Sequence, residues 1–323
     1  MSSLPHFTAL IEDDIQSVEA LMRAPMTGDP PEMRSALELV IAAGGKRIRP
    51  SVSLLVGSML NAPRERLITM AAAIELLHNA TLVHDDLIDG ALLRRGIPTL
   101  NAKWTPAATV LAGDLLFARA AKLAADTESI PAIKMFSETL IRIVGGEVEQ
   151  LLINRTIHNR ADYDRRIYAK TGSLFETAAC TAAMISPVNE DTIQNMAAFG
   201  RAIGMAFQII DDILDFTADE NTLGKPIGSD LRQGLVTLPA LLYFEENAEN
   251  QLVKAFLSNN LHTENPEIET LISAIRSSIA IAAAHQEAHK LVNYGMDILK
   301  RYPASPHRQA LEELSHYIVD RTF

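Results

Sequence analysis

Apolar residues recur at helical spacing along most of this chain, as at Ile74, Leu77 and Leu82 and then at Leu87 and Ile88. Several central stretches are apolar nearly all round, which is typical of buried helices. Turn signals separate these stretches at helix-length intervals, namely residues 25–31, 61–63, 96–98, 186–187 and 303–306. Short alternating runs of β-branched or aromatic residues are scarce. The pattern predicts an all-α bundle of about ten to thirteen helices.

No shift in composition marks a domain boundary, so we expect a single domain over residues 1–323. One long loop, residues 217–234, is rich in Gly, Asp and Lys, and loops of this length are often functional. The longest apolar stretches, such as Val52–Leu60, fall well short of the roughly 20 residues that a membrane span needs. We therefore expect no membrane span.

Net charge and cysteine content indicate which binding partners and which cellular compartment to expect. The net charge of −11 argues against a nucleic-acid partner, because no basic stripe is present to neutralise phosphates. The single cysteine, Cys180, lies in an apolar run, and we expect a buried structural residue rather than a catalytic thiol. The first residues lack the basic and apolar regions of a secretion signal. A lone thiol forms no internal disulfide, which favours a cytoplasmic protein.

Two aspartate clusters share one pattern: two adjacent aspartates, two aliphatic residues and a third aspartate. They are Asp85, Asp86 and Asp89, and Asp211, Asp212 and Asp215. On a helix the first and third members of each cluster project from the same face. Carboxylates on such apolar helices need a compensating cation. A solvated helix end could explain one cluster, but two favour metal binding, and ligands that are all oxygen suit Mg²⁺ best. His84 stands beside the first cluster, and we expect it to support the ligands or to pack rather than to bind the metal.

Basic residues accompany these acids. Residues 44–50, Gly-Gly-Lys-Arg-Ile-Arg-Pro, place three cations in a turn ahead of a helix, a pattern that suits phosphate but also fits a solvated helix end. Arg94 and Arg95 follow the first cluster, and Lys225 lies in the long loop. Lys170-Thr171-Gly172 lies inside an otherwise helical stretch, where the glycine indicates a kink, a close ligand approach or a packing position. Together, Mg²⁺ and these cations would let a diphosphate approach the acids.

The motifs GGKRIRP, HDDLIDGALLRRG, KTG, FQIIDDILD and GKPIGSDLRQGLVTLP follow one another between Gly44 and Leu242. In these motifs and in their order the chain resembles the all-trans polyprenyl (isoprenyl) diphosphate synthases. The resemblance implies a single-domain isoprenoid synthase-type bundle around a central cavity. It also implies a homodimer and a prenyltransferase that adds isopentenyl diphosphate to an allylic diphosphate such as the geranyl, farnesyl or geranylgeranyl ester. The allylic C–O bond would ionise with the help of Mg²⁺, with three ions present when substrate is bound.

The same resemblance assigns roles to individual residues. Lys46, Arg49 and His78 correspond to isopentenyl diphosphate contacts, joined by Arg95. The Mg²⁺ ligands would be Asp85, Asp89 and Asp211, with Asp86, Asp212 and Asp215 in support. The allylic diphosphate would lie against Arg94, Lys170 and Lys225. Thr171 and Gln208 match groups whose oxygens face the developing allylic cation. One residue departs from the family pattern: Leu235 stands where a lysine is common, two residues before Thr237, which puts one phosphate contact in doubt.

The helix that precedes the first cluster bears on product length. Ala80 and Thr81 lie one turn before Asp85, with Leu77 deeper, whereas short-chain members of the family commonly carry bulky aromatic residues at the first of these levels. We therefore predict a long product of about seven to ten prenyl units. The alternatives are a short-chain farnesyl or geranylgeranyl diphosphate synthase, a non-catalytic subunit of a heteromeric synthase, and a terpene cyclase. Intact aspartate clusters argue against the second, and the basic turn and the second cluster against the third.

Overall fold

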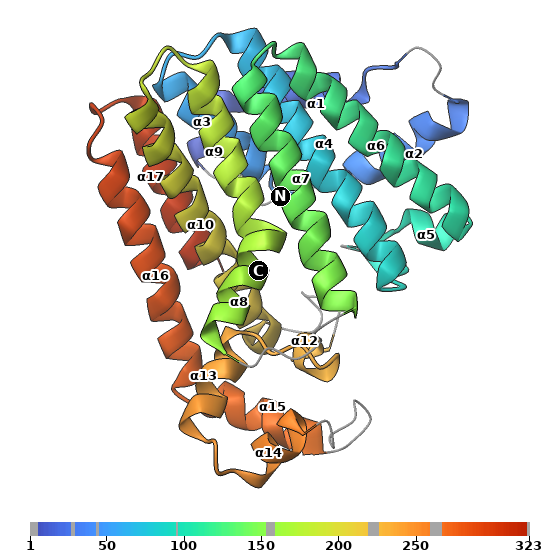
Figure 1. The fold of residues 1–323 in the computed structure, drawn as a ribbon, viewed down its shortest axis with the longest axis vertical. Coiled ribbons are helices and arrows are strands. Elements are labelled where there is room, and N and C mark those ends of the chain that lie inside the picture. Colours follow the sequence, from blue (N-terminus) through green and yellow to red (C-terminus); the bar gives the residue numbers. More distant parts are fainter. Residues whose placement is uncertain are drawn as a thin grey trace. The chain divides into compact units, whose positions relative to one another are not determined.

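The computed structural model describes residues 6–26, 30–42, 45–94, 96–152, 159–218, 226–258 and 267–321. Every long element in these ranges is a helix, and the only strands described are β1 (Leu93–Arg94) and β2 (Ile97–Pro98) (Figure 1). The predicted all-α class is confirmed. The chain forms two compact units: unit 1 is residues 1–141, 174–200 and 298–314, and unit 2 is the remainder. A single domain around a central cavity stays a prediction.

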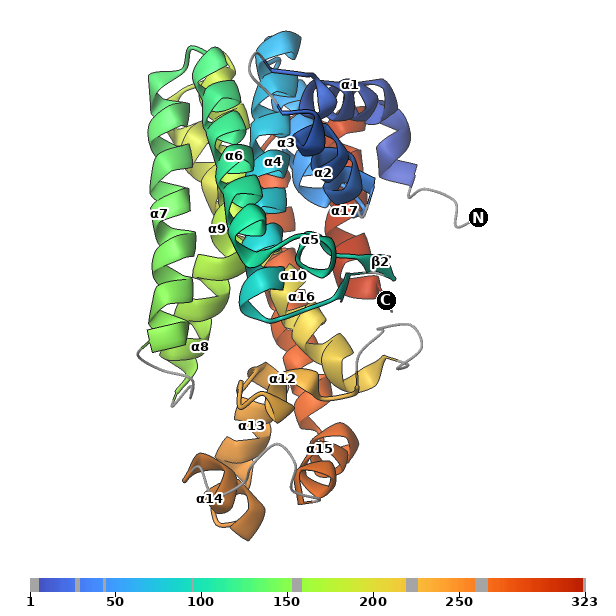
Figure 2. The ribbon, with the colours of Figure 1, turned by 90° about the vertical axis from the view of Figure 1, so that its right-hand side faces the viewer.

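Unit 1 holds the first half of the chain. Its complete elements are η1 (His6–Ile11), α1 (Glu12–Arg23), α2 (Pro31–Ala42), α3 (Ile48–Met59), α4 (Arg64–Ile88), β1, β2, α5 (Leu100–Lys103) and α6 (Pro106–Asp126). Helices α7 (Ile130–Leu152), α9 (Ser173–Ile185), α10 (Glu190–Thr217), α16 (Ala280–Leu299) and α17 (Pro306–Asp320) each contribute part of their length. Helix α4 is central, because α1, α3 and α6 all pack against it (Figure 2).

Helix α4 is buried over most of its length because its sequence leaves almost no polar face. Residues 70–77 are all buried, and Glu75 is the one charged side chain among them. A neighbouring helix approaches closely at Gly113 of α6, where an added Cβ would lie 2.1 Å from His84 Nε2. The His84 ring also lies 5.3 Å from the Phe117 ring, so the structure shows packing, one of the two roles expected for this residue.

Local sequence sets where the helices of unit 1 begin. Thr105 Oγ1 accepts a hydrogen bond from the Ala108 N–H, and Pro106 occupies the first helical position of α6. Thr99 caps α5 in the same way. Both caps satisfy backbone donors that a helix start leaves without partners. The antiparallel pair β1–β2 turns through Gly96, whose φ of 76° suits glycine.

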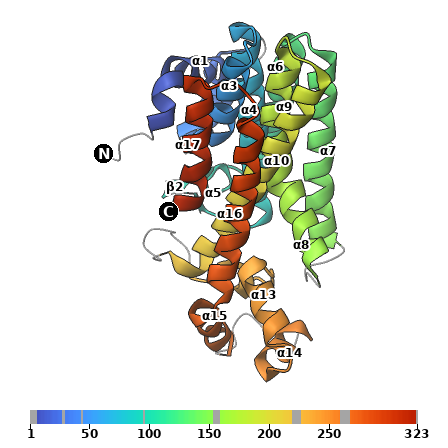
Figure 3. The same ribbon diagram turned by 90° about the vertical axis from the view of Figure 1, so that its left-hand side faces the viewer.

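Unit 2 holds most of the second half of the chain. Its complete elements are α8 (Arg160–Ile167), the π-helical turn η2 (Tyr168–Gly172), α12 (Ser229–Arg232), α13 (Leu238–Glu246), α14 (Gln251–Leu257) and α15 (Glu267–Ser277). Helices α13, α14 and α15 lie together near the start of α16 (Figure 3). Phe244 of α13 packs on Phe256 of α14 with ring centroids 5.5 Å apart, which supplies this cluster with an aromatic core.

Two expectations from composition can be compared with the structure. Cys180 is buried, and burial raises the pKa of its thiol to about 12, so the expected structural role is confirmed and the thiol is not reactive at neutral pH. Among the described helices, α4 is long and apolar enough to cross a membrane by length and composition. Buried core helices pass the same test, and α4 is mostly buried inside unit 1.

Candidate functional site

The first aspartate cluster lies at the very end of α4. The helix closes with a Schellman motif: Ala91 N donates to Asp86 O at 2.9 Å, and Gly90 N donates to Leu87 O at 3.3 Å. Gly90 has a φ of 64°, the left-handed conformation that this motif requires. Asp89 caps the helix and is exposed, while Asp85, one turn earlier, is half-buried. The motif therefore presents both carboxylates at the end of a buried apolar helix.

Asp86 is the buried member of this cluster, at 7% exposure. Arg94 of β1 donates to its carboxylate through Nε and Nη2 at 2.8 to 3.1 Å. Asn101 Nδ2 donates to the Asp86 carbonyl at 3.4 Å. Asp86 thus holds the β1–β2 hairpin against the end of α4. The predicted contact of Arg94 with the allylic diphosphate stays a prediction.

The basic turn before α3 separates its three cations. Lys46 is exposed. Arg49 Nη1 lies 3.1 Å from His78 Nε2 on α4, and its guanidinium lies 4.9 Å from the centre of the Phe175 ring. Arg47 is instead largely buried among carboxylates. The structure thus brings together Arg49 and His78, two of the predicted isopentenyl diphosphate contacts.

The second aspartate cluster occupies the last turns of α10, in unit 2. Asp212 is almost completely buried and accepts hydrogen bonds from Tyr163 OH at 2.8 Å and Gln208 Nε2 at 2.9 Å. Burial, with the nearby charge of Asp230, raises the pKa of Asp212 to about 7. Burial and the charge of Asp212 raise the pKa of Tyr163 well above its ordinary value, so the phenol keeps its proton and donates.

A directed chain of hydrogen bonds extends from Asp212. Because the Gln208 amide nitrogen faces the carboxylate, its oxygen faces Thr171, and Thr171 Oγ1 donates to it at 2.6 Å. Thr171 is buried on η2, a π-helical turn of the kind that often occurs at functional sites. The Lys-Thr-Gly segment thus lies in a π-helical turn that leads directly into α9. Gly172 also packs closely, since an added Cβ would lie 3.0 Å from Met205 Sδ.

The other two aspartates of the second cluster also have protein partners. Asp215 is buried and accepts from Ser229 Oγ at 2.7 Å and from Asp230 N at 3.2 Å, while its carbonyl accepts from Gly228 N at 2.8 Å. It therefore fastens the Gly-Ser-Asp segment that begins α12. Asp211 is more accessible, at 39%, and its Oδ1 lies 2.7 Å from Arg321 Nη2.

The remaining predicted residues are placed as follows. Lys170 Nζ lies 2.8 Å from Glu147 Oε1 of α7. Ala80 and Leu77 are fully buried in α4, and Thr81 Oγ1 donates to His78 O at 2.7 Å. Arg95 and Lys225 lie outside the described residues. The first cluster belongs to unit 1 and the second to unit 2, and their common cavity stays a prediction.

The donor chemistry of the first cluster suits a hard divalent cation. Asp85 and Asp89 supply only oxygen ligands from adjacent turns of one helix. Within the described residues, no group of three acidic, histidine or cysteine side chains is arranged to hold a metal by itself. Mg²⁺ is commonly bound through one or two carboxylates together with water and substrate phosphate oxygens.

Four contributors were not predicted from sequence: Tyr163, Arg321, Glu75 and Ser229. Glu75 carried a signal, because it is a single acid in the apolar run Met70–Leu77. Ser229 lies in the GKPIGSD motif, but its partner Asp215 was not evident. Tyr163 and Arg321 carried no local signal, since their partners are far away in the chain.

Comparison with known proteins decides the family. The polyprenyl synthetase family model matches residues 30–276. The chain belongs to the polyprenyl synthetase family. It is 37% identical over 317 residues to heptaprenyl diphosphate synthase component 2 of Geobacillus stearothermophilus, covering 98% of each chain. It is 32% identical to octaprenyl diphosphate synthase of Escherichia coli, covering 99% of each.

Solved structures of polyprenyl synthetases agree with this assignment. A polyprenyl synthase from Caulobacter crescentus, crystallised with calcium and isoprenyl diphosphate, superimposes with a TM-score of 0.91 at 34% identity. The match covers 99% of this chain and 98% of the other. The chain is therefore a prenyltransferase of a family that uses a divalent metal.

Proposed function

We propose that this protein condenses isopentenyl diphosphate with an allylic diphosphate to give a long-chain all-trans polyprenyl diphosphate, with Mg²⁺ as the metal. The observation that carries the proposal is the pair Asp85 and Asp89, both oxygen ligands, at the end of a buried apolar helix. Relatives named heptaprenyl and octaprenyl diphosphate synthases support the long product. We also propose a cytoplasmic location, in keeping with the single buried cysteine.

The predicted residues of both units have parts in the proposed reaction. Asp85 and Asp89, with Asp211, would hold Mg²⁺, which when bound neutralises charge that develops on the departing diphosphate. Arg49 and His78, with Lys46, would bind isopentenyl diphosphate. The Thr171 proton is already directed at Gln208, so the hydroxyl lone pairs remain to face the allylic cation. The double bond of isopentenyl diphosphate then attacks the cation, and a proton leaves to pyrophosphate.

Product length tests the long-chain part of the proposal. The protein is incubated with farnesyl diphosphate, isopentenyl diphosphate and Mg²⁺, and the products are measured by mass. We expect about seven to ten prenyl units from the wild type and shorter products from Ala80→Phe, with Ala80→Val intermediate. Thermal melting checks that the variants fold. A wild-type enzyme that stops at farnesyl or geranylgeranyl diphosphate would contradict the long-chain assignment.

The exposed face of α7 supports the proposed homodimer. Ile141, Val144, Val148 and Leu151 are exposed at alternating spacings of three and four residues, the pattern of a helix–helix seam. Val148→Asp should convert a dimer to a monomer in sedimentation analysis. Glu138→Gln, at another exposed position of α7, should leave the assembly unchanged.

A heteromeric synthase is the second candidate for the assembly. It is favoured by one observation, that a relative at 37% identity is named component 2 of its enzyme. Activity of the purified chain discriminates the two candidates. A homodimer elongates farnesyl diphosphate by itself, whereas a component of a heteromer requires an added partner.

A further inference from the structure

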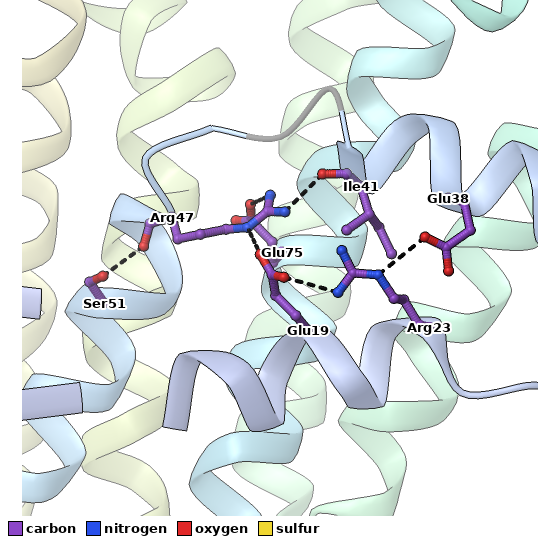
Figure 4. A network of polar contacts seen from close by, with 7 residues as sticks. All are labelled: Glu19, Arg23, Glu38, Ile41, Arg47, Ser51 and Glu75. Carbon is purple, nitrogen blue, oxygen red and sulfur yellow. Dashed lines mark hydrogen bonds and ion pairs between the residues drawn. The ribbon is translucent and has the colours of Figure 1, made fainter. Parts of the chain in front are cut away.

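Arg47 stands between two predicted substrate contacts, yet its guanidinium is buried inside unit 1. Its Nε donates to Glu19 Oε1 at 2.8 Å, its Nη1 to Glu75 Oε1 at 3.0 Å and its Nη2 to Ile41 O at 3.0 Å (Figure 4). The side chain is 10% exposed, and that of Glu75 only 4%. One guanidinium therefore joins α1, α2 and α4. We call Arg47 and its three partners, Glu19, Glu75 and Ile41, the Arg47 clamp.

A second arginine, on α1 and outside the clamp, bonds to Glu19. Arg23 Nη1 donates to Glu19 Oε2 at 2.9 Å, and Arg23 Nε donates to Glu38 Oε2 at 3.3 Å (Figure 4). Burial raises the pKa of Glu19, but hydrogen bonds from Arg23 and Arg47 outweigh this, and the pKa lies below its usual value. Glu19 is therefore ionised at neutral pH, and its bonds to both arginines are charge-assisted.

The backbone of Arg47 adopts an uncommon conformation. Its φ and ψ are 50° and 35°, in the left-handed region that a residue with a side chain seldom occupies. In this position the Arg47 carbonyl accepts from Ser51 N at 3.0 Å and from Ser51 Oγ at 2.8 Å, and so begins α3 (Figure 4). Such a conformation persists only where surrounding contacts hold it, and the clamp supplies those contacts.

The clamp also sets the register between the start of α3 and α4. Glu75 and His78 are three residues apart on α4 and so are neighbours on its surface. Arg47 bonds to Glu75, and Arg49 lies 3.1 Å from His78. Both contacts join the start of α3 to the same face of α4. A shift of Arg47 along α4 would therefore separate Arg49 from His78.

We infer that Arg47 is a positioning residue for isopentenyl diphosphate, acting with Glu75 and Glu19 to orient Lys46, Arg49 and His78. The inference rests on the proposed function of those three residues. We expect Arg47 itself to make no contact with substrate, because each of its three nitrogens donates to Glu19, Glu75 or Ile41. Through the Arg47 clamp, the position of α1 would then affect the affinity for isopentenyl diphosphate.

Arg47→Lys and Glu19→Gln test the inference in the full-length enzyme. Lysine keeps the charge, but a single ammonium cannot span Glu19, Glu75 and Ile41 together. We expect the KM for isopentenyl diphosphate to rise about tenfold in Arg47→Lys and about threefold in Glu19→Gln, the size of one charge-assisted hydrogen bond or a fraction of it. The KM for farnesyl diphosphate should stay within about twofold in both variants.

Arg23→Gln is the matched control. It removes the outer arginine of the same network, which bonds to Glu19 and Glu38 but not to Glu75. We expect a lower melting temperature and an unchanged KM for isopentenyl diphosphate. If Arg47→Lys does not fold, Glu19→Gln carries the test, because Glu19 is more exposed, at 29%.

Two results would overturn the inference: an unchanged KM for isopentenyl diphosphate in folded variants, or an equal rise in both KM values that Arg23→Gln reproduces. A wild-type enzyme that does not elongate farnesyl diphosphate would instead contradict the proposed function. Calorimetric binding of isopentenyl diphosphate, with Mg²⁺ and a thiolodiphosphate analogue of farnesyl diphosphate that cannot ionise, separates the two failures. The same selective loss is expected there without turnover.

Discussion

The two aspartate clusters have the same spacing but use their carboxylates differently. In the first, at the end of α4, Asp89 is exposed and Asp85 half-buried, while the middle residue Asp86 is paired with Arg94. In the second, near the end of α10, the middle and last residues, Asp212 and Asp215, are both buried and accept hydrogen bonds from unit 2. One of the three carboxylates is buried in the first cluster, whereas two of the three are buried in the second.

A repeated motif therefore does not imply a repeated role. A carboxylate that is accessible can change ligands at little cost, whereas a buried one leaves its donors without a partner when it is removed. Substitutions at Asp85 and Asp89 should therefore reduce catalysis with little loss of stability. Substitutions around the second should reduce stability as well.

The largest expected effect is that of Asp85→Asn. Loss of a metal ligand removes several kcal/mol of stabilisation of the departing diphosphate, so kcat/KM should fall about a thousandfold. Because Asp85 is only half-buried, the melting temperature should change by no more than a few degrees. Asp13→Asn, at an exposed position on α1, should keep activity within about twofold of the wild type. A folded Asp85→Asn variant with near-normal activity would remove the basis for the first metal site.

The second prediction concerns pH and Asp212. Its pKa is about 7 in the folded protein and 3.8 for an unperturbed aspartate, so between these values the native state keeps a proton that the unfolded state has lost. The contribution of Asp212 to stability is therefore fully present below about pH 4, is lost as pH rises toward 7 and is level above, by an amount on the order of 4 kcal/mol. Urea unfolding in EDTA measures this slope.

Asp212→Asn is the comparison for the pH prediction. The variant has no titratable group at this position, so its unfolding free energy should depend less on pH between 4 and 7 than that of the wild type. Other groups, such as His285, whose pKa is lowered by burial and by His289, contribute equally to both proteins. Parallel stability curves for the two proteins would show that Asp212 ionises normally.

Tyr163→Phe should have a smaller effect. It removes the donor to Asp212 Oδ2 and leaves the ring in place, at a cost of about 2 kcal/mol for a buried hydrogen bond to a carboxylate. Asp212 orients Gln208 and hence Thr171. The factor by which kcat falls should therefore be larger than the factor by which the KM for either substrate changes. Tyr294→Phe, at an exposed position on α16, is the control. Equal stability of Tyr163→Phe and the wild type would contradict the described network.

The sequence predicted the all-α class because α4, α6 and α10 carry long apolar patterns with helical period, which depend only on local spacing. It also predicted that Asp85 and Asp89 share one helix face. The partners of these residues depend on tertiary structure instead. Tyr163 reaches Asp212 from 49 positions away, and Arg321 reaches Asp211 from near the end of the chain.

Arg47 shows a second limit of sequence reasoning. Three cations in one turn predict a phosphate site, and nothing in the spacing of Lys46, Arg47 and Arg49 distinguishes the one that turns inward. The left-handed backbone of Arg47 and the buried Glu75 decide this, and neither follows from residue type. A lone acid in an apolar helix was the available signal, because burial of a charge requires a partner.

Ser229→Ala should have the smallest effect and tests the second cluster most locally. Ser229 Oγ donates to Asp215 Oδ1 at 2.7 Å, and the residue lies one position beyond Gly228, where α12 begins. Loss of this bond should lower the free energy of unfolding by about 1.5 kcal/mol. Ser186→Ala is the matched control, because that buried hydroxyl donates to the uncharged Ala182 carbonyl and should contribute less. If both substitutions cost the same, Asp215 gains nothing from its charge at this position, and the contrast between the two clusters would reduce to burial alone.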